Sequence, residues 1–166
     1  MNWEEEMELN WGPTFAHESG HALMALLQGI PCHGIYFERG EDGGRFCALL
    51  ANPSDQRSKS DYLVSAAGVA AELLIYPNQN SGGAEADRED FCASDAPSFE
   101  GMASEARQIL AGQRGKLENL ISKLKARVRS VDFDLSRLPE VGMDGSDTRY
   151  LTLLDESELK TLIAQD

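Results

Sequence analysis

An apolar helix that carries two histidines four residues apart constrains this chain more than any other feature. Residues 13–27 read Pro-Thr-Phe-Ala-His-Glu-Ser-Gly-His-Ala-Leu-Met-Ala-Leu-Leu, with Pro13 suited to a first helical turn and Gly29 to a left-handed cap. Positions i and i+4 share one face of a helix, so the imidazoles of His17 and His21 can converge on one metal ion. Unpaired imidazoles would be costly in a buried helix of this kind.

Residues 17–21 form the pattern H-E-x-x-H, which supplies parts of a zinc peptidase site. Glu18 follows the first histidine and so points to the side of the histidine pair. There it can contact a metal-bound water without being a ligand. The alternative is that two core histidines and a surface glutamate share this spacing by chance. The three matching residues and their helical context favour the metal site.

A third ligand is expected from elsewhere in the fold, because catalytic zinc usually takes three protein ligands and leaves one position for water. The candidates are Glu72, Glu85, Asp87, Glu89, Asp90 and His33. His33 ranks last, because isolated histidines are usually structural or solvated. The residues alone leave the choice among the acids open.

The rest of the chain predicts an α+β fold that is mostly helical. Residues 34–38 and 45–50 are β-prone runs around a Gly- and Asp-rich turn. They predict a small hairpin beside the helix over residues 13–27, which carries the H-E-x-x-H motif and is the motif helix. Residues 60–76 are apolar almost all round and predict a buried helix that ends before Pro77. No repeat interrupts the 166 residues, so residues 1–166 are expected to form one domain.

Glu72 is the one charged residue between Tyr62 and Ile75 in the predicted buried helix. A buried carboxylate needs a partner, and a metal-bound histidine is a natural one. The alternative is a solvated position near the end of the helix. In the same helix, Gly68 is expected to allow close approach of a neighbouring backbone, at Gly20 of the motif helix.

The N-terminal and C-terminal segments carry weaker signals. Residues 1–12 predict an irregular arm docked by its two tryptophans, Trp3 and Trp11. Helices are expected from residue 84, over 99–110 and over 116–131, followed by a loop over 135–147 and a strand over 150–154. A last helix over 155–163 begins with a capping box formed by Asp155 and Glu158.

Composition excludes some classes of partner. A net charge of −13 argues against nucleic acid, which needs a basic surface. No apolar run approaches the length of a membrane span and no signal peptide is present, so a cytoplasmic protein is expected. Cys32, Cys47 and Cys92 form no C-x-x-C pair and are expected to be free thiols. Residues 112–117 resemble the end of a phosphate-binding loop but lack its first glycine and its Ser or Thr.

Three segments together resemble the peptidase domain of the FtsH family of ATP-dependent zinc metalloproteases. They are residues 16–23, 68–73 and 83–87, in the order of the family and with the hairpin between the first and second. The resemblance covers residues 13–92 and implies a zincin-type peptidase domain with Zn²⁺ as cofactor. It implies that Asp87 is the third zinc ligand. It also implies that Glu72 orients a ligand histidine without binding the metal.

The expected activity is zinc-dependent hydrolysis of peptide bonds in unfolded or flexible protein substrates, with Glu18 as general base. The family's membrane anchor and ATPase module have no counterpart in these residues, so activity is expected without ATP unless a separate ATPase partner takes part. An extended substrate is expected to pair with the edge of the strand at residues 45–50.

Two alternatives to this activity stay open. One is a different H-E-x-x-H peptidase that acts on a single regulatory protein. The other is a non-catalytic module, with or without zinc, that binds or regulates a partner protein. Glu18 favours an enzyme, because a structural zinc site needs ligands only.

Overall fold

The computed structural model describes residues 5, 11–40, 43–51, 56–130 and 149–164. Its elements, in chain order, are α2 (Gly12–Leu27), β1 (Cys32–Gly40), β2 (Gly43–Leu50), α3 (Lys59–Ile75), α4 (Ala84–Glu89), α5 (Phe99–Ala111), α6 (Arg114–Ser130), β3 (Arg149–Asp155) and α7 (Glu156–Ala164). The described part of the chain is therefore mixed α and β and mostly helical, as the sequence predicts.

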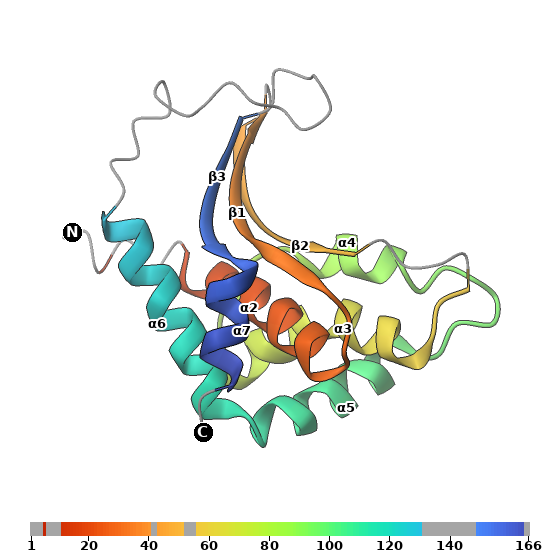
Figure 1. The fold of residues 1–166 in the computed structure, drawn as a ribbon. Coiled ribbons are helices and arrows are strands. Elements are labelled where there is room, and N and C mark those ends of the chain that lie inside the picture. The colour runs from red at the N-terminus through yellow and green to blue at the C-terminus, as the bar shows by residue number, and fades with distance from the viewer. Residues whose placement is uncertain (1–4, 6–10, 41–42, 52–55, 131–148, 165–166) are drawn as a thin grey trace.

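The strands form one antiparallel sheet with the order β2-β1-β3. The predicted hairpin is confirmed as β1 and β2, and β3 adds to the other edge of β1 from the C-terminal part of the chain. Helix α2 packs against α3 on one side and against the sheet on the other (Figure 1). Strand β2 is thus an edge strand that runs beside the motif helix.

Helix α2 forms the centre of the core because its sequence is apolar on most sides. Phe15, Leu23 and Met24 are fully buried. The helix ends where the sequence predicts, since Gly29 has a φ of 72° and the Ile30 N–H donates to the Ala25 carbonyl at 2.8 Å. The left-handed glycine turns the chain from α2 into β1.

Helix α3 is the predicted buried helix, and its start is set by a capping box. The Ser58 hydroxyl accepts from the Asp61 N–H, and the Asp61 carboxylate accepts from the Ser58 N–H at 2.7 Å. At Gly20 of α2, an added Cβ would lie 2.5 Å from the Ala67 carbonyl oxygen of α3. The glycine therefore lets the two helices approach closely.

The predicted pairing of Gly68 with Gly20 is wrong. An added Cβ at Gly68 would lie 2.6 Å from Nε2 of His17 and 2.6 Å from Nε2 of His21. Gly68 therefore makes room for the two imidazoles, and Ala67 and Ala71 are the residues that face Gly20.

The C-terminal predictions hold in the described residues. Helix α6 buries one face, formed by Leu117, Leu120, Ile121, Leu124 and Val128. Strand β3 confirms the predicted short strand. The capping box of α7 is present, with the Glu158 N–H donating to Asp155 at 2.8 Å. The segment predicted to be a loop, residues 135–147, lies outside the described residues, as does Trp3.

Three other predictions concern Trp11, the cysteines and membrane-spanning helices. Trp11 contacts Phe15 and Phe46 edge-on, so this tryptophan is docked as expected. All three cysteines are free. Among the described residues, no helix combines the length and apolar character that crossing a membrane requires.

Candidate metal centre

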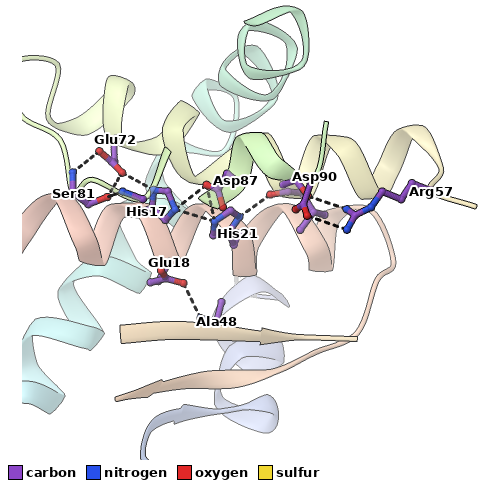
Figure 2. Close-up of polar contacts among 12 residues, drawn as sticks. His17, Glu18, His21, Ala48, Arg57, Glu72, Ser81, Asp87 and Asp90 are labelled. Carbon is purple, nitrogen blue, oxygen red and sulfur yellow. Dashed lines mark hydrogen bonds and ion pairs between the residues drawn. The ribbon is translucent and has the colours of Figure 1, made fainter. Parts of the chain in front are cut away.

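Three side chains from two helices converge at one point beside α2. Asp87 Oδ2 of α4 lies 2.9 Å from His17 Nε2 and 3.3 Å from His21 Nε2. The two Nε2 atoms are 3.0 Å apart. Ligands about 2.0–2.1 Å from a tetrahedral zinc ion are about 3.3 Å from one another. These three atoms therefore have nearly the spacing of three zinc ligands (Figure 2).

The outer hydrogen bonds of both histidines decide which nitrogen carries a proton. His17 Nδ1 donates to Glu72 Oε1 at 2.5 Å, and His21 Nδ1 donates to the Val64 carbonyl at 2.7 Å. A neutral imidazole has one N–H, so each Nε2 is left with a lone pair. Asp87 Oδ2 is buried and has no hydrogen-bond donor. Two lone pairs and a carboxylate oxygen repel one another at these distances unless a cation lies between them.

The pKa values of these groups show how strongly the cluster favours a positive charge. Burial lowers the pKa of His17, but the carboxylates of Asp87 and Glu72 stabilise its protonated form and raise the pKa to about 10. Burial raises the pKa of Asp87, but the imidazoles of His17 and His21, when protonated, stabilise its carboxylate and lower the pKa to about 2. A proton can supply the charge in the metal-free protein, and a divalent metal can replace it.

Two glycines leave space for the imidazole of His17. Gly68 of α3 lies against one part of the ring, and an added Cβ at Gly83 would lie 2.7 Å from its Cε1 atom. The ring is thus held between α3 and the residue that precedes α4. Side chains at either glycine would displace the histidine.

Glu72 fixes the orientation of His17. It is buried, and its carboxylate also accepts from the Ser81 hydroxyl at 2.5 Å and from the Ser81 N–H at 2.9 Å. Burial raises the pKa of Glu72. The hydrogen bonds from His17 and Ser81 lower this pKa by more than burial raises it, so the net shift is downward. The predicted contact of Glu72 with a histidine is confirmed, and the solvated alternative is wrong.

Glu18 lies on the side of α2 that faces the sheet (Figure 2). Its Oε2 accepts from the Ala48 N–H of β2 at 2.7 Å. Burial raises the pKa of Glu18, and the nearby His21 and His17 oppose that rise only in part. Glu18 and the three converging side chains line the same cleft of about 670 Å³. Aromatic side chains of Trp11, Phe37 and Phe46 also line it.

The structure separates the third-ligand candidates. Asp90 instead binds Arg57 and Ser65. Glu85 and Glu89 are exposed, and His33 lies 3.5 Å from Glu156 at the surface. Among the described residues, His17, His21 and Asp87 are the group whose ligand atoms could hold one metal ion.

Three contacts at the site were not anticipated from the sequence. They involve Ser81, the Val64 carbonyl and the Ala48 amide. The Val64 carbonyl and the Ala48 amide are backbone groups, so the type of residue at these positions gives no sign of the contact. Ser81 could have been suspected only because it precedes Gly82 and Gly83, between two segments that carry site residues.

Comparisons with protein-family models and with curated proteins find no match for this chain. The resemblance to the FtsH peptidase domain thus depends on three short segments. Each of them contributes to the same centre: residues 16–23 carry the two histidines, 68–73 carry Gly68 and Glu72, and 83–87 carry Asp87.

Proposed function

We propose that this chain is a zinc-dependent metallopeptidase of the zincin type, similar to the peptidase domain of the FtsH family. The observation that carries the proposal is the convergence of two imidazole lone pairs and a donor-less, buried carboxylate oxygen. Two histidines and one carboxylate are a common ligand set of catalytic zinc. His17, His21 and Asp87 would hold the ion.

The ligand set supports catalysis because it leaves room for a water molecule. Bound zinc would lower the pKa of a water ligand toward about 7 and polarise the scissile carbonyl group. The three ligands come from α2 and α4, and the cleft of about 670 Å³ that they line with residues of β2 has room for a water molecule and a substrate segment.

Glu18 is the general base in this proposal. It lies next to His17 in the same cleft and is not one of the converging ligand groups. Burial raises the pKa of Glu18, so its carboxylate is a stronger proton acceptor than that of an exposed glutamate. Glu18 accepts a proton from the attacking water and delivers it to the leaving amine. The Ala48 N–H holds the carboxylate in place at the edge of the cleft.

Strand β2 supports a peptide substrate in extended form. β2 pairs with β1 along one edge, and its other edge directs the Ala48 N–H toward Glu18. An extended chain that adds to this edge lies beside the proposed base and the metal ligands. Such a mode requires an unfolded or flexible segment, because a folded substrate does not expose its backbone.

The experiment that tests the function combines metal analysis with cleavage of an unfolded protein. We expect purified protein to contain about one zinc per chain and to hydrolyse casein, and a chelator to abolish hydrolysis. Added zinc should then restore it. Bound zinc without hydrolysis would support the non-catalytic binding module instead. Hydrolysis that a chelator does not affect would contradict both.

A further inference from the structure

Helix α4 supplies Asp87 but has little stability of its own. It is six residues long, and none of these residues is buried. A helix of this length is unstable in isolation. The position of Asp87 therefore depends on contacts that join α4 and its flanking residues to the rest of the molecule.

Asp90, which directly follows α4, makes polar contacts with Ser65 of α3 and with Arg57, which precedes α3. Its Oδ2 accepts from the Ser65 hydroxyl at 2.7 Å, and its Oδ1 accepts from Arg57 Nη2 at 3.0 Å. Asp90 follows Asp87 by three residues, so both carboxylates lie on the same face of α4. That face points toward α3 and the two histidines (Figure 2).

Ser65 connects Asp90 to the backbone that orients His21. Its side chain is largely buried in α3, with 8% of the residue exposed. It directly follows Val64, whose carbonyl accepts from His21 Nδ1. Asp90 is therefore bound next to the contact that orients one ligand.

Helix stability does not explain a carboxylate at position 90. A negative charge at the C-terminal end of a helix is unfavourable, because that end carries the partial negative charge of the helix dipole. Asp90 also lies outside the group of side chains that could hold a metal ion. Its charge is matched by Arg57, so the favourable interactions of Asp90 are tertiary.

We propose that Asp90 is a positioning residue for the third metal ligand. Its bonds to Ser65 and Arg57 hold α4 against α3 and thereby keep Asp87 at the Nε2 atoms of His17 and His21. The effect on zinc rests on the proposed function, whereas the attachment of α4 does not.

The chain offers a matched control in an ion pair that joins α4 to α5. Arg88 pairs with Glu100 at 2.6 Å, and their side chains are 50% and 71% exposed. Exposed ion pairs contribute little to stability. Glu100→Gln breaks this pair and leaves the contact of Arg88 with the Phe99 ring in place. Glu100→Gln therefore tests whether the loss of any ion pair near α4 has the same effect on zinc binding as the loss of the Asp90 contacts.

Zinc affinity, measured by competition with a chelator, tests the positioning role. We expect Asp90→Asn and Ser65→Ala to raise the dissociation constant roughly 10-fold, as losses of groups that orient a ligand do. Glu100→Gln should stay within about twofold of the wild type. In an Asp87→Ala background, Asp90→Asn should cause no further loss, because Asp90 acts through Asp87. An equal loss with and without Asp87 would overturn the proposal.

Hydrogen exchange in the metal-free protein separates this inference from the proposed function. Amides of residues 84–91 should exchange faster in Asp90→Asn and Ser65→Ala than in the wild type or in Glu100→Gln. A wild-type protein that binds no zinc would contradict the metallopeptidase, and the exchange rates would still decide whether Asp90 holds α4. Unchanged exchange in both variants would overturn the inference about Asp90.

Discussion

At the scale of single residues, Glu18 separates catalysis from metal binding. It shares the cleft with His17, His21 and Asp87, but its own hydrogen bond goes to β2. If the proposed function holds, Glu18→Gln should keep zinc and lose hydrolysis by about 10²–10⁴-fold or more, because the variant lacks the proposed general base. Zinc content and casein cleavage are measured on the same preparation. Wild-type turnover in a zinc-loaded Glu18→Gln variant is incompatible with the mechanism.

Asp87 and Glu72 differ in what they contact, and this difference predicts opposite results on zinc binding. Asp87→Ala removes one of the three converging side chains proposed as metal ligands, and this variant should lose zinc on dialysis. Glu72→Gln keeps an oxygen for His17 and should weaken zinc binding by about 10–100-fold while retaining much of the metal. Zinc stoichiometry after dialysis distinguishes the two variants. A metal-free Glu72→Gln beside a fully loaded Asp87→Ala would reverse the assignment.

The shifted pKa values predict how the stability of the metal-free protein depends on pH. For His17 the pKa is 6.5 ordinarily and about 10 in the fold, so its contribution is full below pH 6.5 and is lost as pH rises toward 10. For Asp87 the pKa falls from 3.8 to about 2, so its contribution is full above pH 3.8 and is lost toward pH 2.

We therefore expect the free energy of unfolding, measured with urea in the presence of chelator, to fall between about pH 6.5 and about pH 10. His17→Ala should show a smaller fall, because the group that titrates is absent. If both proteins lose the same amount of stability, His17 is not responsible for the change.

The site residues differ in how far the sequence could predict them. The spacing of His17 and His21 places both imidazoles on one helix face without any knowledge of the tertiary structure. Asp87 could not be chosen over the other acids by such reasoning, because helical periodicity does not report the distance between α2 and α4. The resemblance to a family favoured it, and the structure then brought it to the histidines.

At the scale of elements, the contact of α3 with α2 leaves no room for a side chain at Gly68. An added Cβ would lie 2.6 Å from Nε2 of both histidines. Alanine favours a helix over glycine by about 1 kcal/mol, so Gly68→Ala stabilises α3 locally while it displaces the imidazoles. We expect zinc affinity to fall.

Gly101→Ala in α5 is the matched control, because its nearest contact there would be an ordinary 3.6 Å. This variant should keep zinc affinity unchanged. Equal zinc affinity in both alanine variants and the wild type would show that the histidines do not need the space at Gly68.

Element predictions succeeded where a local pattern determines the type of element and its burial. Such patterns are the apolar run of α3, the apolar face of α6, and the turn between the two β-prone runs of the β1–β2 hairpin. Helix α4 was predicted only by its start, and it is short because no buried face extends it. The partner of Gly68 was wrong because the register between two packed helices depends on all the side chains between them, which sequence spacing does not include.

At the scale of the whole molecule, the expected independence from ATP can be tested directly. Residues 112 and 113 join α5 to α6, and residues 114–117 form the start of α6. This glycine- and lysine-containing segment therefore follows a helix, whereas a phosphate-binding loop follows a strand. Adding ATP and Mg²⁺ to the pure protein should leave casein cleavage unchanged. Degradation of a stably folded substrate that depends on ATP would contradict this expectation.

The pairing of β3 with β1 has a consequence for synthesis on the ribosome. Every residue of the metal centre precedes residue 91, whereas β3 spans Arg149–Asp155. Synthesis proceeds at roughly 5–20 residues per second. For several seconds, therefore, the residues of the proposed metal centre have been synthesised while β3 has not, and one edge of β1 has no partner strand. Because an unpaired strand edge can associate with other chains, β1 is open to such pairing during this interval.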